Sequence, residues 1–210
     1  MATPQAKLEI RLTEAEYLAM ERASDVKHQY LDGHICAMAG ELPAHGKISV
    51  NLVGELYGQL KGSQCELFTK DTKVRSGPDP NPSWPPKGLF SYPDVVIVCG
   101  EAKYHDDYRD VLLNPKVIIE VLSEATAGFD ASEKFRRYRE WLPGLSDYVL
   151  VSSLEMLVEH YRKQSSGDWL LSTIRNPNAA LKIESVGCEV SLQDIYARVD
   201  FQSTETNFAE

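Results

Sequence analysis

Two carboxylates of this sequence lie in or beside short apolar runs, where a charge is costly to bury. Asp94 immediately precedes the run Val95 to Val98, and Glu120 lies inside the run Lys116 to Ser123. Short runs rich in β-branched residues predict buried strands, and a carboxylate in such a strand needs a partner to offset its lost hydration. On neighbouring strands the two carboxylates could share one divalent cation. Oxygen ligands of this kind favour Mg²⁺ or Mn²⁺ over zinc.

The alternation of side chains along a strand sets the surroundings of Glu120. It places Ile118, Glu120 and Leu122 on the same face. Glu120 therefore shares its face with apolar residues rather than with a polar row. Two interpretations follow: a metal ligand that acts together with Asp94, or a buried carboxylate neutralised by an Arg or Lys.

A helix is predicted shortly after the Glu120 strand. Asp130 is expected as its N-cap, with Glu133 three residues later. Within this helix Lys134 and Tyr138 are four residues apart and share a face. A metal ion can orient a water molecule and lower its pKa, and a nearby lysine can position the nucleophile or offset charge on the phosphoryl group. The combination predicts phosphodiester hydrolysis, although paired carboxylates alone are a weak signal.

The rest of the pattern predicts the elements that position these residues. Thr13 and Glu16 form a capping box, Asp32-Gly33 is a favoured hairpin turn, and His45 precedes an amphipathic helix. Further strands are expected at 66–68, 72–75, 147–151, 155–163, 169–174 and 181–184, with an irregular Pro-rich loop at 76–87. This order predicts an α/β chain whose central mixed sheet is flanked by helices. The two carboxylates would then lie on adjacent central strands.

The composition indicates an ordinary soluble globular protein. The 210 residues are 43% apolar and 25% charged, which suits one domain over 1–200 followed by a polar tail at 201–210. No apolar run approaches the roughly 20 residues that span a bilayer, and no secretion signal is visible. We therefore expect a cytoplasmic protein with no membrane partner. The cysteines at positions 36, 65, 99 and 188 form no Cys-x-x-Cys pair and are expected to be buried free thiols.

The charge balance is unfavourable for a broad nucleic-acid-binding surface. The net charge is −9 and the pI is about 5.1, whereas phosphate contacts need clustered Lys and Arg. A local basic face or a bound cation can still attract phosphate within an acidic molecule.

Three groups of residues carry a resemblance to a known family: Tyr92 to Val98, Glu120 to Thr126, and Asp130 with Lys134 and Tyr138. From about Leu12 to Tyr196, the sequence resembles the Uma2 family, which belongs to the PD-(D/E)xK nuclease superfamily. The resemblance implies a restriction-endonuclease-like fold and a DNA substrate. It also implies a Mg²⁺ or Mn²⁺ ion held by Asp94, Glu120 and the backbone carbonyl of Val121.

The resemblance assigns further residues and exposes two departures from the family pattern. The superfamily places a lysine two residues after the acidic residue, but Leu122 stands there, and Lys134 on the following helix takes that role. Gln29 stands where the family often has glutamate, and His45 matches a recurring family histidine. Both are assigned to the catalytic site as auxiliary residues. Many nucleases of this fold need two active sites, so we expect a homodimer, with the hairpin at 155–174 as a candidate edge.

Two functions from different classes fit these observations. The first is a metal-dependent DNA endonuclease that uses Asp94, Glu120 and Lys134. The second is a catalytically weak or inactive scaffold or DNA-associated module that keeps the fold, which Gln29, Leu122 and the acidic pI favour. A hydrolase of another phosphoester is a minor third interpretation.

Overall fold

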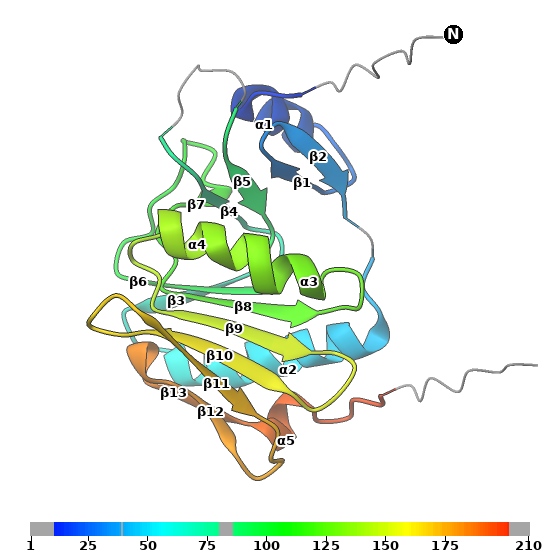
Figure 1. The fold of residues 1–210 in the computed structure, drawn as a ribbon, viewed down its shortest axis with the longest axis vertical. Helices are drawn as coiled ribbons and strands as arrows, with labels where there is room; N and C mark the ends of the chain where they lie inside the picture. Colours follow the sequence, from blue (N-terminus) through cyan, green and yellow to red (C-terminus); the bar gives the residue numbers. More distant parts are fainter. Residues whose placement is uncertain (1–10, 39, 80–85, 202–210) are drawn as a thin grey trace, which may run out of the picture.

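The computed structural model describes residues 11–38, 40–79 and 86–201. Its largest sheet has six strands in the order β11-β10-β9-β8-β6-β3 (Figure 1). These strands are β3 (Cys65–Thr69), β6 (Val95–Cys99), β8 (Val117–Leu122), β9 (Asp147–Ser152), β10 (Val158–Lys163) and β11 (Trp169–Ile174). β8 pairs with β9 in parallel, whereas the other neighbours are antiparallel. The sheet is therefore mixed, as the sequence predicts.

Helices cover both faces of this sheet (Figure 1). On one face lies α2 (Pro43–Leu60), whose Ile48, Leu52 and Leu56 pack in a core with the side chains of β6 and β8 that point the same way. On the other face lie α3 (Ala127–Phe129), a π-helical turn η1 (Asp130–Lys134) and α4 (Phe135–Trp141). Phe135 and Tyr138 pack there on the opposite faces of the same strands. This division follows the two-residue alternation of the strands.

The two carboxylate-bearing strands are neighbours in the middle of the sheet. β6 pairs antiparallel with β8, with Val95 opposite Ile119 and Ile97 opposite Val117. The next positions in this register are Asp94 and Glu120. The prediction that these two residues lie on adjacent central strands is confirmed.

A second sheet of five strands has the order β2-β1-β5-β4-β7. Its strands are β1 (His28–Leu31), β2 (His34–Ala37), β4 (Lys73–Ser76), β5 (Leu89–Ser91) and β7 (Val111–Leu112). The predicted hairpin is confirmed, because β1 and β2 flank Asp32 and Gly33, whose φ angles of 49° and 93° are those a tight two-residue turn requires. The predicted capping box of Thr13 and Glu16 begins α1 (Glu14–Arg22), which packs against this sheet.

The C-terminal part of the chain is more regular than the sequence predicts. The expected edge strand is present as β12 (Ala180–Ile183), but it pairs with β13 (Cys188–Ser191), which the sequence analysis does not find. β13 has only four residues, too few for its alternation to be recognised. Between them lies η2 (Glu184–Val186), and α5 (Leu192–Ile195) follows with Ser191 as its N-cap.

The expectation of four buried free thiols is wrong. Cys65 and Cys99 form a disulfide, Cys188 is buried and free, and Cys36 is exposed and free. The antiparallel register of β3 and β6 places Cys65 directly opposite Cys99. Their separation of 34 residues in the chain gives no hint of this pairing, since it depends on strand order alone.

Among the described residues, no helix combines the length and apolar character needed to cross a membrane. Residues 80–85 of the predicted Pro-rich loop lie outside the described residues, as do residues 202–210 of the predicted tail.

Candidate active site

A buried ion-paired group lies between β8 and the helix that follows it. Glu120 on β8 is 3% exposed, and its Oε1 lies 2.8 Å from Nζ of Lys134. The same Nζ donates a hydrogen bond of 3.0 Å to Oδ1 of Asp130. Lys134 and Asp130 are each 4% exposed. One lysine therefore faces two buried carboxylates in a nearly water-free environment.

The π-helical turn determines where Lys134 points. Asp130 has helical backbone angles, φ −64° and ψ −43°, and the helical segment already begins at Ala127. The prediction that Asp130 is an N-cap is therefore wrong: its side chain binds Lys134, and its carbonyl accepts a hydrogen bond of 2.9 Å from the hydroxyl of Tyr148. A π-turn is a local insertion into an α-helix and is often found at functional sites.

Opposing effects act on the protonation of this group. The pKa of Glu120 is raised to about 8, because burial, together with the nearby carboxylates Asp130 and Asp94, outweighs the lowering effect of Lys134. Burial lowers the pKa of Lys134, but Glu120, Tyr138 and Asp130 outweigh it and hold that pKa well above its ordinary value. Lys134 is therefore a charged donor at neutral pH. The influence of Asp94 on Glu120 also shows that the two carboxylates are electrostatic neighbours.

Asp94 lies one residue before β6 and is fixed from two sides. Its Oδ2 accepts a hydrogen bond of 2.7 Å from the backbone N–H of Val121 on β8. The same oxygen lies 3.4 Å from Nε2 of His45 on α2. The Val121 contact ties the start of β6 to the residue directly after Glu120.

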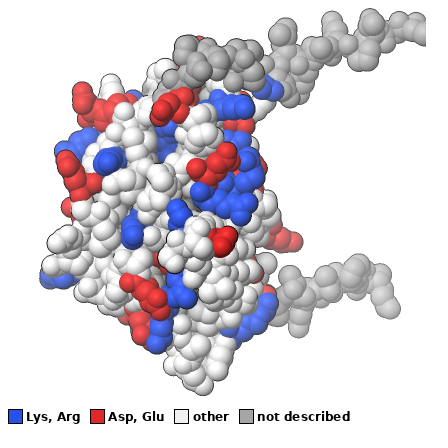
Figure 2. Space-filling view, turned by 60° about the vertical axis from the view of Figure 1, so that its left-hand side comes forward, with Lys and Arg blue, Asp and Glu red and all other residues white. Residues whose placement is uncertain are grey.

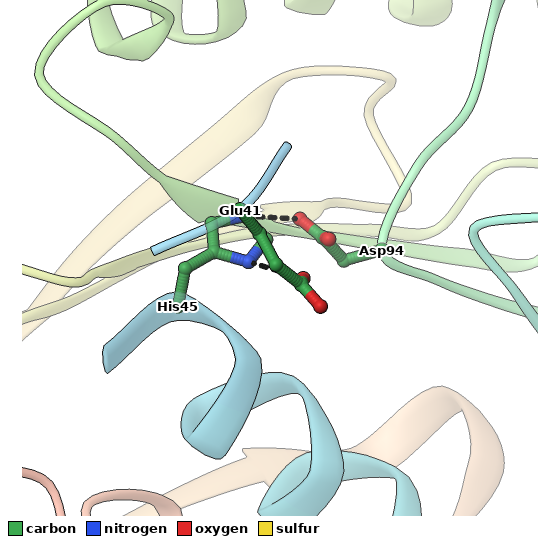
Figure 3. A group of neighbouring side chains, drawn as sticks. All are labelled: Glu41, His45 and Asp94. Atoms are coloured by element: carbon green, nitrogen blue, oxygen red, sulfur yellow. Dashed lines mark hydrogen bonds and ion pairs between the residues drawn. The ribbon is translucent and has the colours of Figure 1, made fainter. Parts of the chain in front are cut away.

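His45 connects Asp94 to a third carboxylate, Glu41 (Figure 3). Its Nδ1 lies 3.1 Å from Oε2 of Glu41. Burial lowers the pKa of His45, but the two carboxylates outweigh burial and raise it above its ordinary value. One ligand atom from each of Glu41, His45 and Asp94 lies within 4.8 Å of the others, a spacing that could hold a cation.

The predicted auxiliary residue Gln29 lies on β1, in the second sheet. β1 pairs antiparallel with β5, with Tyr30 opposite Phe90, so the next position in that register sets Gln29 opposite Ser91. Ser91 is buried, and its hydroxyl lies 2.6 Å from that of Tyr138. Gln29 thus shares a strand face with a residue that contacts α4. Its assignment to the site stays a prediction.

Sequence reasoning missed Glu41 altogether. It named Asp130, but it missed the contact of the Asp130 side chain with Lys134. Glu41 stands four residues before His45, a separation that brings side chains together on a helix. It precedes the predicted helix, however, and so it gave no clear signal. Asp130 lay in a strong capping pattern that concealed its contact with Lys134.

Comparison with known proteins decides the family. A family model described as "Putative restriction endonuclease", Uma2, matches residues 14–193. The chain belongs to the Uma2 family. Two relatives from Synechocystis sp. are each 33% identical to it: the uncharacterized protein sll1609 over 81% of this chain and 92% of its own length, and the uncharacterized protein slr1290 over 91% and 94%.

A solved structure supports the fold of this Uma2 protein. It is a crystal structure from Anabaena variabilis described as a putative nuclease belonging to DUF820, with a TM-score of 0.69 and 17% sequence identity. The match covers 88% of this chain and 97% of that one. At this level of identity the likeness concerns the fold, which is a mixed α+β fold.

The donor groups of this Uma2 protein fit a hard divalent cation. Within the described chain, Oε1 of Glu120 is a buried oxygen that accepts no hydrogen bond, although the Lys134 ammonium lies at ion-pair distance. A buried carboxylate oxygen without a hydrogen bond is costly. Carboxylates at Asp94 and Glu120 supply the oxygen ligands that Mg²⁺ and Mn²⁺ prefer, so the residues present are compatible with such an ion.

Proposed function

We propose that this Uma2 protein is a metal-dependent endonuclease that hydrolyses phosphodiester bonds of DNA. The observation that carries the proposal is the Glu120–Lys134 pair, buried on β8 and η1, with Asp94 at the start of the neighbouring strand, one residue before β6. Such a group of two carboxylates and a lysine is otherwise expensive to bury. Perturbed titratable groups gathered at one place are typical of functional sites.

In this proposal Asp94, Glu120 and the backbone carbonyl of Val121 hold Mg²⁺ or Mn²⁺. When bound, the ion supplies Lewis-acid stabilisation of the phosphate and a water molecule of lowered pKa. Lys134 keeps its proton and orients the attacking water or offsets negative charge on the phosphate. His45, held by Glu41, fixes the orientation of Asp94 through Nε2.

One face of the molecule carries basic side chains of the kind that contact phosphate groups. Figure 2 shows a face on which basic side chains gather in places among scattered acidic ones, despite the overall charge of −9. A bound cation would add positive charge at the site itself.

The direct test is cleavage of supercoiled plasmid and single-stranded DNA with Mg²⁺ or Mn²⁺. We expect wild-type protein to nick DNA only with metal, and Asp94→Ala or Glu120→Gln to lower the rate by at least about 10²-fold, because each removes a metal ligand. The exposed Glu66→Ala on β3 is the matched control and should cleave at the wild-type rate. Equal cleavage by wild type and Asp94→Ala would show that the site is assigned wrongly.

The second candidate is a DNA-associated scaffold without catalysis, favoured by Gln29 and Leu122. Calorimetric titration with Mn²⁺ separates it from the nuclease. Site-specific binding that disappears in Glu120→Gln supports the nuclease, whereas no binding at millimolar metal, together with no cleavage, supports the scaffold. Cleavage of a non-nucleotide phosphoester but not of DNA would support the third interpretation.

We further propose that the protein is a homodimer that pairs through β11. This strand ends the six-stranded sheet and exposes Leu170 and Leu171, at 45% and 44%. An exposed apolar edge strand is a ready partner for another strand. Light scattering should give a dimer mass that Leu170→Lys reduces to a monomer, whereas Leu154→Lys, at a 61% exposed leucine outside this strand, should not. A monomer mass for wild type at micromolar concentration contradicts the dimer.

A further inference from the structure

The Asp32 carboxylate links three segments that are far apart in the chain. Its Oδ1 accepts hydrogen bonds from the backbone N–H of Gly88 at 2.9 Å and from Nη1 of Arg137 at 3.0 Å. Its Oδ2 accepts a bond of 2.5 Å from Nη2 of Arg137. The β1–β2 turn, the segment entering β5 and helix α4 therefore meet at one side chain.

The turn itself does not need this charge. Asp32 adopts a left-handed conformation, with φ 49°, and asparagine tolerates that conformation as well as aspartate does. The carboxylate instead matches the planar guanidinium in a two-pronged pair, which is the strongest form of such a contact. The long-range pair is thus a feature separate from the local turn.

Arg137 is well placed to fix the rotation of α4. It is 8% exposed, and its Nε also donates a bond of 2.7 Å to Glu133 on its own helical segment. It lies three residues after Lys134, about one helical turn away. The Arg137 guanidinium is held by Asp32, a carboxylate outside the helix. This contact therefore fixes the rotation of the helix about its own axis, and with it the direction in which the preceding turn presents Lys134. The buried Ser91–Tyr138 contact provides a second tether, to β5.

We propose that the Asp32–Arg137 pair is a positioning pair that aligns Lys134 with Glu120. The effect of this pair on cleavage rests on the proposed nuclease function, whereas its effect on the placement of Lys134 does not. Without Asp32 the guanidinium keeps Glu133 as a partner, so the fold is retained while the helix gains freedom to rotate. Displacements of about 1 Å at catalytic groups can lower rates by about 10²-fold.

Chemical labelling of lysines tests the geometry independently of cleavage. Acetylation by a short pulse of N-hydroxysuccinimide acetate, read by mass spectrometry, reports the access of reagent to each ε-amine. In Asp32→Asn and in Arg137→Lys we expect acetylation of Lys134 to rise several-fold above wild type. Lys73 is the internal reference, because it is equally buried, at 5%, and ion-paired to Asp110. Its labelling should not change.

Arg136→Lys is the matched control for Arg137→Lys, since it makes the same substitution one residue earlier, at an arginine that binds only Glu133 and Glu140 in the described contacts. It should leave the labelling of Lys134 unchanged. Unchanged Lys134 in Asp32→Asn, or an equal rise at Lys73, overturns the proposal.

Kinetics then test the consequence for the reaction. If wild type cleaves DNA, Asp32→Asn should lower kcat by about tenfold or more while KM stays within about twofold. A normal kcat alongside raised labelling would overturn the positioning role. If wild type does not cleave, the nuclease proposal fails, and the labelling result still decides whether the pair holds Lys134.

Discussion

Lys134 and Glu120 neutralise each other in a place that water scarcely reaches, so the loss of either partner makes the charge on the other costly to keep. The strand alternation predicts correctly that Glu120 shares a face with apolar residues, and Ile118 and Leu122 both belong to or border the core on that side. Of the two interpretations of Glu120 stated from sequence, the structure confirms the cationic partner, Lys134, and the metal ligand stays a prediction. Glu120 has a cationic partner, and it stands beside Asp94, so a structural ion pair and a metal ligand are compatible uses of one side chain.

Replacing Lys134 tests its role at this scale. Lys134→Met keeps most of the buried volume but removes the ammonium, and we expect cleavage to fall by about 10²–10⁴-fold, since an electrostatic stabiliser of the phosphate is lost. Because burial already raises the pKa of Glu120 to about 8, that carboxylate can take up a proton, and the variant should remain folded by circular dichroism. Lys103→Met, at an exposed lysine, is the control. Wild-type cleavage by a folded Lys134→Met protein contradicts the assignment.

At the same scale, the sequence could supply residue types but not all the contacts. It singled out Asp94, Glu120 and Lys134 as candidates, because strand pattern and family resemblance act on short segments, and their roles stay predictions. It did not identify Glu41, which stands before α2 and reaches His45 and Lys70. It also did not identify Asp130 as a partner of Lys134. Contacts of this kind depend on how elements are rotated against one another, and no single segment encodes that rotation.

At the scale of elements, the π-turn lies in the segment that carries Lys134, the residue proposed to replace the lysine absent from position 122. An α-helix starting at Ala127 would advance by about 100° per residue, and the inserted residue of the π-turn resets that phase. Asp130 and Lys134 are both buried, and Lys134 faces Glu120 on β8. Sequence patterns predicted a helix over this segment correctly, but they placed its start four residues late and could not detect the insertion.

Removing one residue from η1 tests this explanation. Deletion of the exposed Ser132 should convert the π-turn to an α-helix, and it shortens the separation of Asp130 and Lys134 from four residues to three, which displaces the Asp130 carboxylate from the Lys134 ammonium. We expect cleavage to fall by at least about 10²-fold, as for other misplaced catalytic groups. Helical content by circular dichroism should be retained. Substitution Ser132→Ala is the control, and a deletion variant that cleaves normally would exclude the phase argument.

At the scale of the whole molecule, α1 is attached to the second sheet by a charged cluster that the sequence analysis does not predict. Arg22 at the end of α1 donates hydrogen bonds to Asp106 at 2.8 Å and to Asp110 at 2.7 Å. Lys73 on β4, 5% exposed, forms an ion pair of 3.0 Å with Asp110. The mixture of acidic and aromatic residues at 101–110 gave no sign of this, since its partners lie far away in the chain.

This cluster makes part of the stability depend on pH. Partial burial raises the pKa of Asp110, but hydrogen bonds from Arg22 and Lys73 outweigh it and lower that pKa to about 2. The folded protein thus binds the Asp110 proton more weakly than the unfolded chain, whose ordinary value is 3.8. The resulting stabilisation is fully present above the unfolded value, and it is lost as the pH falls from there through about 2.

Urea unfolding of Asp110→Asn against wild type measures this contribution. We expect the variant to be less stable at pH 7 by about 1–2 kcal/mol, after allowance for solvent screening of a partly exposed group. The difference should shrink between pH 4 and pH 3, because Asp110 of the unfolded chain takes up its proton there, whereas Asp110 of the folded protein does so only near pH 2. Asp107→Asn, at an exposed aspartate three residues earlier, should match wild type at every pH. A difference that is the same at pH 7 and pH 3 would mean that Asp110 stabilises the attachment of α1 by packing rather than by charge.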